Sequence, residues 1–219
     1  MRILAFDTTM NACAIALWAD GGIVARRIDT MTHGQAEALV PAIEATLAEA
    51  GLGYADLDRI AVTTGPGSFT GVRVGLATAR GLGLAAGLPV IGIGTAEVLA
   101  ATARRTEAAS GEITVVIDAR RAEVYAQTFD ARGAPLGGAQ CLLPSAVTVT
   151  ADTLLAGDAV ARVAGRLPAK PHAVELAYAD PADLAALASV RSLDGPAPTP
   201  LYVRPPDAVV PRDGGRLRP

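Results

Sequence analysis

The sequence predicts an α/β fold made of two similar halves. In each half an apolar run ends in an aspartate, Asp7 or Asp118, and a turn and a second apolar run follow. Apolar runs of this length that are bounded by turn residues are typical of strands, so each half is expected to open with a β-hairpin. A third strand is expected in each half, at about residues 23–29 and 138–143.

The elements that follow extend this repeat. In the first half, apolar residues at helical spacing predict a helix over residues 35–50, and Pro41 inside it predicts that the helix starts late or kinks. A strand, a helix, a strand and a further helix complete the order. The second half is abbreviated, with its next strand at residues 154–158 and its last clear helix at residues 181–191.

Duplicated, this order of elements is the layout of the actin-like ATPase (ASKHA) fold. In that fold two ribonuclease-H-like lobes flank a cleft. We therefore expect an N-terminal lobe at residues 1–108, an abbreviated C-terminal lobe at residues 109–194, and a tail at residues 195–219. The tail is rich in proline and is expected to be extended.

Composition sets the broad class of the protein. The chain has 219 residues, of which 51% are hydrophobic and 19% charged, so it can bury a sizeable core. A net charge of −3 argues against nucleic-acid binding by the chain alone, because such binding normally needs a basic patch. Cys13 and Cys141 give no disulfide or zinc pattern. The first residues resemble a strand rather than a signal peptide, and residues 81–96 are too short to span a bilayer, so a cytoplasmic protein without membrane contact is expected.

A glycine-rich loop follows the strand at residues 59–64 and opens a helix that runs to about Gly87. The loop fails the tests for both common phosphate-binding loops. Its third glycine comes one residue late for a dinucleotide-binding loop, no acid ends the next strand, and the last glycine lacks the Lys-Ser or Lys-Thr pair of a P-loop. We therefore expect a structural turn, in which Ser68 or Thr70 caps the helix. The motif consists of Gly65, Pro66, Gly67, Ser68, Thr70, Gly71 and Arg73.

The helix after this loop is almost free of charge. Arg73 and Arg80 are its only charged residues, and their spacing puts them on one face. A helix that is apolar all round is buried, so this helix packs either in the chain's own core or against a partner. A stripe of small residues at i, i+4 spacing would let a second helix approach closely. The stripe consists of Gly71, Gly75, Ala79 and Gly83.

Asp7 and Asp118 are the candidate nucleotide-binding residues, because acids at these strand ends face metal and phosphate in actin-like folds. Alternatively, each aspartate simply caps a hairpin turn. The two histidines, His33 and His172, have no second ligand at metal-binding spacing, and the sequence has no nucleophile elbow. If the two aspartates do bind nucleotide, the alternative function is an actin-like, ATP-dependent phosphotransferase that uses Asp7 and Asp118.

Four segments together resemble the TsaB (YeaZ) family. They are residues 3–9, 65–73, 117–125 and 202–204, so the resemblance covers nearly the whole chain. Residues 150–170 are shorter than in the family. The resemblance implies a non-catalytic subunit of the bacterial machinery that places threonylcarbamoyl on the tRNA adenosine next to the anticodon.

The resemblance also implies partners. The catalytic subunit is a paralogue, TsaD, which TsaB-like proteins bind and activate, and a TsaE-like ATPase is the third partner. The chain is expected to form a homodimer when alone and a heterodimer with the paralogue, and to meet tRNA through the complex rather than directly.

The resemblance further implies that this chain holds no metal. The paralogue's metal-binding histidine pair corresponds here to Thr95 and Leu99, which cannot ligate a metal. We therefore expect no catalytic residue and no resident cofactor, with ATP or ADP bound weakly or at the partner interface. A zinc peptidase, a third interpretation, is disfavoured by the same substitutions.

The family interface is a helical bundle made by the two main helices of the N-terminal lobe. This agrees with the charge-poor helix described above. The predicted interface residues are Leu39, Ile43, Leu47, Val72, Gly75, Leu76, Ala79 and Gly83.

Overall fold

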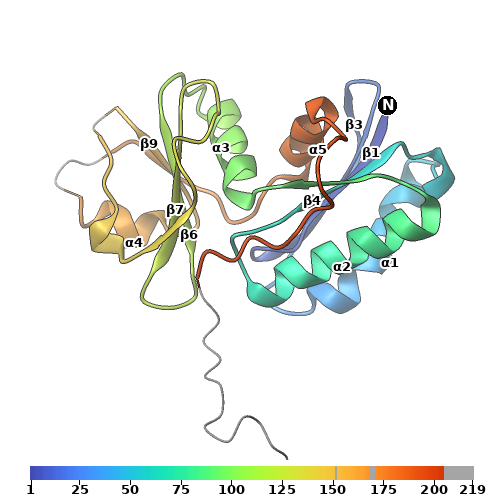
Figure 1. The fold of residues 1–219 in the computed structure, drawn as a ribbon, viewed down its shortest axis with the longest axis horizontal. Coiled ribbons are helices and arrows are strands. Elements are labelled where there is room, and N and C mark those ends of the chain that lie inside the picture. Colours follow the sequence, from blue (N-terminus) through green and yellow to red (C-terminus); the bar gives the residue numbers. More distant parts are fainter. Residues whose placement is uncertain (151, 168–170, 205–219) are drawn as a thin grey trace, which may run out of the picture.

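The computed structural model describes residues 1–150, 152–167 and 171–204. Its strands form two five-stranded sheets, one from each half of the chain (Figure 1). The first sheet has the order β3-β2-β1-β4-β5 and consists of β1 (Arg2–Asp7), β2 (Ala12–Ala19), β3 (Gly22–Thr30), β4 (Arg59–Thr63) and β5 (Val90–Ile93). The second has the order β10-β9-β6-β7-β8 and consists of β6 (Ile113–Asp118), β7 (Val124–Phe129), β8 (Gln140–Leu142), β9 (Leu154–Gly157) and β10 (Ala173–Glu175).

Both sheets are built around the first strand of a hairpin. Strand β1 pairs antiparallel with β2 and parallel with β4, and strand β6 pairs in the same way with β7 and β9. Strand β1 is buried after its first residue, as expected for a strand that is covered on both faces. The repeated strand order confirms the actin-like fold with two ribonuclease-H-like lobes.

The helices form an outer layer and an inner layer. They are α1 (Gln35–Glu49), α2 (Phe69–Ala86), α3 (Thr95–Thr106), α4 (Val160–Ala164) and α5 (Pro181–Val190), with 3-10 helices at Tyr54–Asp56 and Pro144–Ala146. Helices α1 and α2 cover one face of the first sheet and α5 covers the other, whereas α3 packs on the second sheet (Figure 1). Within the described ranges, none of the helices has the length and apolar character needed to span a bilayer.

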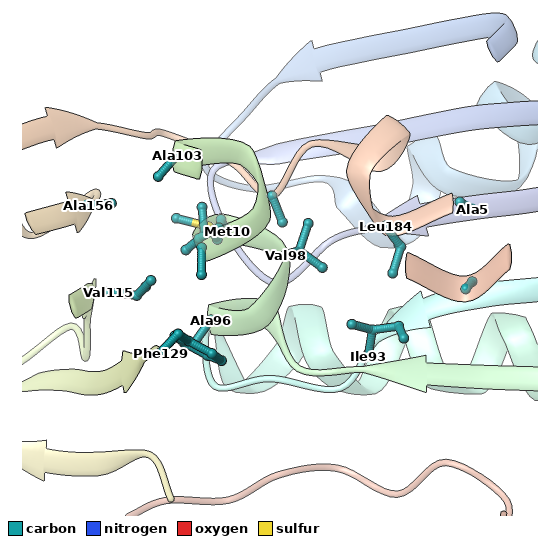
Figure 2. Close-up of a cluster of buried hydrophobic side chains, with 14 of the residues drawn as sticks. Ala5, Met10, Ile93, Ala96, Val98, Ala103, Val115, Phe129, Ala156 and Leu184 are labelled. Atoms are coloured by element: carbon teal, nitrogen blue, oxygen red, sulfur yellow. The ribbon is translucent and has the colours of Figure 1, made fainter. Parts of the chain in front are cut away.

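The two lobes share a hydrophobic core that lies between the sheets. This core joins Ala5 and Ile93 of the first sheet to Val115 and Phe129 of the second, with side chains of α3 and α5 packed among them (Figure 2). Helix α3 follows the first sheet in sequence but packs on the second, and α5 does the reverse. Each half of the chain therefore contributes one helix that packs on the sheet of the other half. The predicted division of the chain near residue 108 stays a prediction.

The ends of the two outer helices follow from local sequence. Helix α1 begins at Gln35, so the expected late start is wrong. Pro41 is exposed within α1, where the carbonyl that it leaves without an amide partner can be hydrated. Helix α2 is capped by Ser68 rather than Thr70, because the Ser68 hydroxyl accepts a hydrogen bond from the Gly71 amide. Gly87 ends α2 in a left-handed conformation (φ 68°).

Candidate functional site

The glycine-rich loop packs against the turn that follows β1. The Ser68 amide donates to the Thr9 carbonyl (2.7 Å), and the Thr8 hydroxyl donates to the Gly71 carbonyl (2.7 Å). A Cβ atom on Gly71 would lie 1.9 Å from the Thr8 carbonyl oxygen, and one on Gly67 would lie 2.4 Å from that of Thr9. These glycines therefore admit the chain's own backbone, which agrees with the structural interpretation of the motif.

Asp7 is fully buried where the glycine-rich loop packs against the turn after β1. Its side chain is 0% exposed, and its Oδ1 accepts hydrogen bonds from the Thr9 amide (3.0 Å), the Thr9 hydroxyl (2.6 Å) and the Thr63 hydroxyl (2.5 Å). Burial raises the pKa of Asp7 above its ordinary value, while the hydrogen bonds from Thr63 and Thr9 act in the opposite direction. Among the described residues, Oδ2 has no hydrogen-bond partner. Asp7 thus fixes a turn in the first lobe.

Asp118 occupies the equivalent strand end in the second lobe but is held differently. Its Oδ1 accepts from the Arg120 amide (2.9 Å) and forms an ion pair with Arg162 of α4. Arg162 also donates to the carbonyls of Arg121 (2.7 Å) and Ala122 (2.8 Å). One guanidinium group therefore balances the carboxylate and fixes the turn after β6.

The two turns meet across the lobes. The Arg120 guanidinium, in the turn after β6, donates to the Asn11 side-chain oxygen (2.6 Å), in the turn after β1. The Asp118 amide donates to Asp158 Oδ1 (2.8 Å), and burial raises the pKa of Asp158. The structure thus brings the two turns together, while each predicted aspartate is engaged within its own lobe. Sequence reasoning missed Arg162, because a lone arginine on a short helix gives no pattern.

Thr95 and Leu99, the two positions that the resemblance matches with a metal-binding histidine pair, lie in the core. Thr95 and Leu99 are buried on α3, and the Thr95 hydroxyl lies 3.1 Å from that of Thr9. His33 contacts Thr32, and His172 lies 3.4 Å from Glu107. In the described part of the chain, no three acidic, histidine or cysteine side chains are grouped as metal ligands.

The eight predicted interface residues are all buried in the chain's own core, so as an outward surface this prediction is wrong. Leu39, Ile43 and Leu47 of α1 pack toward the first sheet. On α2, a Cβ on Gly75 would meet Thr8 and Val62, so the small stripe faces the sheet and not a second helix. The physical reason is that glycine lets a helix approach the sheet closely. The inward residues of α2 are Gly71, Val72, Gly75, Leu76, Ala79 and Gly83.

The same two helices expose a different face. Helix α2 presents a stripe of Phe69, Arg73, Ala77, Arg80 and Leu84, of which Leu84 is 88% exposed. Helix α1, which contacts α2, exposes Val40, Pro41, Ala45 and Ala48. The exposed charges of α1 are acidic (Glu37, Glu44 and Glu49), whereas those of α2 are basic. We call this surface the outer face of α1 and α2.

Residues 198–202, which we call the strap, lie along one side of α2. The Leu201 amide donates to the Thr64 carbonyl (2.8 Å), Arg80 donates to the Pro198 carbonyl (2.5 Å), and Arg73 Nε donates to the Tyr202 hydroxyl (2.9 Å). The two arginines of α2 therefore hold the strap in place. Of the predicted proline-rich tail, residues 205–219 lie outside the described residues.

Comparisons with known proteins identify relatives over most of the chain. A family model described as "TsaD: tRNA N6-adenosine threonylcarbamoyltransferase" matches residues 20–186. The TsaB protein of Escherichia coli K12, named for tRNA threonylcarbamoyladenosine biosynthesis, is 41% identical over 125 residues, which cover 57% of this chain and 53% of that protein. This match spans about half the length of that relative. An uncharacterized protein of Mycobacterium bovis is 38% identical over 94% of this chain and 93% of its own length.

Solved structures extend the similarity to the whole fold. The structure of YeaZ from Pseudomonas aeruginosa superposes with a TM-score of 0.81 at 30% identity, covering 92% of this chain and 99% of that chain. A second P. aeruginosa structure, described as similar to the peptidase YeaZ, gives a TM-score of 0.83 at 32% identity, covering 93% of this chain and 99% of that chain.

Proposed function

Because this chain belongs to the TsaB (YeaZ) family, we propose that it acts in making N6-threonylcarbamoyladenosine in tRNA, as a subunit that binds and activates a TsaD-like transferase. The observation that carries this proposal is the outer face of α1 and α2, which leaves apolar side chains such as Leu84 and Val40 exposed. Exposed apolar side chains gathered on one face and flanked by charged residues are typical of protein–protein interfaces.

The contacts of the two strand-end aspartates, Asp7 and Asp118, support a binding role over a catalytic one. Asp7 is 0% exposed, and its Oδ1 is occupied by hydrogen bonds from Thr9 and Thr63. Asp118 is ion-paired with Arg162. A phosphotransferase that used these carboxylates would first have to displace protein contacts at both. Any ATP or ADP is therefore proposed to bind weakly or at the partner interface.

The charges of the outer face define the partner's chemistry. Helix α1 exposes Glu37, Glu44 and Glu49, and α2 exposes Arg73 and Arg80. A complementary partner would present two helices of opposite pattern, and opposite charges across an interface fix register and suppress wrong partners. The same segregation would let two copies pair about a two-fold axis, which fits the proposed homodimer of the chain when it is alone.

The remaining partners follow from the family. We place a TsaE-like ATPase as the third partner and expect tRNA to be held mainly by the complex, because the net charge of −3 gives this chain little attraction for phosphate. The cytoplasm is the proposed site of this work.

Complex formation tests the proposal. The purified chain and the TsaD-like protein of the same organism, measured by size-exclusion light scattering, should give a one-to-one heterodimer. Leu84→Arg should abolish it, because an unpaired charge would be buried at the interface. Val190→Arg is the matched control, since Val190 is 84% exposed and lies at the end of α5, on the other side of the first sheet. If wild-type protein gives no complex even with ATP and the TsaE-like protein present, the proposal is wrong.

A further inference from the structure

Two exposed aromatic rings lie side by side at the start of α2. Only 4% of the residues in this chain are aromatic. Among those that the structure describes, Phe69 (56% exposed) and Tyr202 (47% exposed) are the ones whose side chains are left largely open to solvent. Their ring centroids are 5.7 Å apart, although the two residues are far apart in sequence. Two such rings held together in water point to a contact that covers them.

A third side chain joins the rings into one unit. The Arg73 guanidinium lies 3.7 Å from the centroid of the Phe69 ring, and its Nε donates to the Tyr202 hydroxyl (2.9 Å). A guanidinium over an aromatic face gains a cation–π attraction. Phe69, Arg73 and Tyr202 are therefore held in one geometry; we call them the aromatic cluster.

The strap fixes Tyr202 before any partner arrives. Its backbone is held at Leu201 by Thr64 and at Pro198 by Arg80. The prolines at 198 and 200 restrict the chain between these points. A surface that is ordered in advance loses less conformational entropy on binding, so its contacts contribute more to affinity.

The aromatic cluster continues the outer face of α2. Phe69 and Arg73 are the first members of the exposed stripe that runs through Ala77 and Arg80 to Leu84. The small residues Ala77 and Gly81 would let a partner helix approach closely. Aromatic and arginine side chains of this kind carry much of the binding energy in protein interfaces.

We propose that Phe69, Arg73 and Tyr202 anchor the TsaD-like partner, with an apolar side chain of a partner helix packed against the two rings. This inference rests on the function proposed above and makes the strap a part of the binding surface. A tRNA base stacked on the rings is disfavoured, because the net charge of −3 gives this chain little overall attraction for the phosphate backbone, although Arg73 lies beside the rings and Arg80 lies further along the same face.

Calorimetric titration of the TsaD-like protein with variants of this chain tests the inference. Phe69→Ala and Tyr202→Ala should each weaken binding by about tenfold or more, as for truncated anchor residues. Tyr202→Phe keeps the ring and should stay within about threefold of wild type. Leu143→Ala is the matched control, since Leu143 is similarly exposed (52%) but lies in the second lobe. Melting curves establish that each variant is folded.

The possible outcomes separate this inference from the proposed function. If both alanine variants bind like wild type while Leu84→Arg does not bind, the aromatic cluster is not the anchor, although the proposed function stands. If the alanine variants leave the heterodimer unchanged and weaken only tRNA binding by the complex, the rings serve RNA and the inference is overturned. If wild-type protein forms no complex, the proposed function and this inference fail together.

Discussion

The two lobes share a strand order but differ in what surrounds it. The first sheet carries two long outer helices, α1 and α2, with a broad exposed face, whereas the second carries the 3-10 helix Pro144–Ala146 and the five-residue α4 in the corresponding places. In the first lobe, α1 and α2 cover the sheet with one face and expose the opposite face to solvent. The difference suggests that binding is the task of the first lobe.

The turns at the ends of β1 and β6 differ in a parallel way. In the first lobe, close backbone packing and threonine hydroxyls seal Asp7 from solvent. In the second lobe, the guanidinium of Arg162 holds Asp118 and the turn that follows it. Two different sets of protein contacts thus occupy the positions where an actin-like enzyme would hold phosphate and metal. The following predictions test this contrast.

The largest effect is expected where the first-lobe turn meets α2. Gly71→Ala would place a methyl group 1.9 Å from the Thr8 carbonyl oxygen, so we expect a loss of about 3 kcal/mol or more in unfolding free energy. Gly81→Ala, in the same helix, meets no atom within 4 Å and should stabilise the protein by about 0.5–1 kcal/mol. Urea unfolding measures both. Equal effects of the two substitutions would contradict the close packing.

A smaller effect is expected from the ion pair of the second lobe. Arg162→Gln removes the partner of Asp118 and of the carbonyls of Arg121 and Ala122, and should cost about 1–3 kcal/mol. Arg27→Gln is the control, because Arg27 and Asp29 form an exposed pair, and should change stability by less than about 0.5 kcal/mol. Denaturant midpoints measure both variants. Equal midpoints for Arg162→Gln and Arg27→Gln would show that the Arg162 contacts do not stabilise the second lobe.

The buried carboxyl of Asp7 predicts a pH dependence of stability. Because burial raises the pKa of Asp7, the folded state keeps a proton that the unfolded chain releases once the pH rises above about 4. The stability of the wild-type protein therefore falls as the pH rises from about 4 to the raised pKa of Asp7. Above that pKa the loss of stability stays constant. Asp7→Asn lacks the effect, so its stability relative to wild type should increase over that window. Parallel stability profiles from pH 4 to 8 would show that the pKa is not raised.

The smallest effect is expected at the strap, which extends from the first lobe toward the second. Arg80→Gln removes the hydrogen bond to the Pro198 carbonyl and should lower global stability by less than about 1 kcal/mol. Hydrogen exchange at the Leu201 amide should nevertheless become faster, because the strap opens locally. An unchanged exchange rate at Leu201 would mean that Arg80 does not hold the strap.

Much of the architecture could be predicted because its signals are local. Apolar runs that end at Asp7 and Asp118 predicted the two hairpins, and the structure has β1 and β6 end at these residues. Gly87 and the residues around Ser68 predicted the ends of α2 to within one residue. These signals depend on backbone propensities that neighbouring residues determine.

The outward face of α2 was missed, although Arg73 and Arg80 mark it, because the other residues of the helix are apolar, small or threonine on every side. In the structure Gly75 and Ala79 face the sheet, while Ala77 and Leu84 share the outward face with the two arginines. The contacts of Arg162 with Asp118, and of Arg73 with Tyr202, join residues far apart in sequence and leave no local signal. The aromatic cluster therefore appears only when the chain is folded.

Reconstituted transfer of threonylcarbamoyl to tRNA tests whether this chain activates a TsaD-like transferase without taking part in the chemistry. A TsaD-like and a TsaE-like protein would be assayed without this chain, and then with the wild type, Leu84→Arg or a folded Asp7→Asn variant. We expect little transfer without the chain, full transfer with wild type and with Asp7→Asn, and none with Leu84→Arg. Loss of transfer with Asp7→Asn, in a heterodimer that still forms, would contradict the non-catalytic role and implicate Asp7 of this chain in the chemistry.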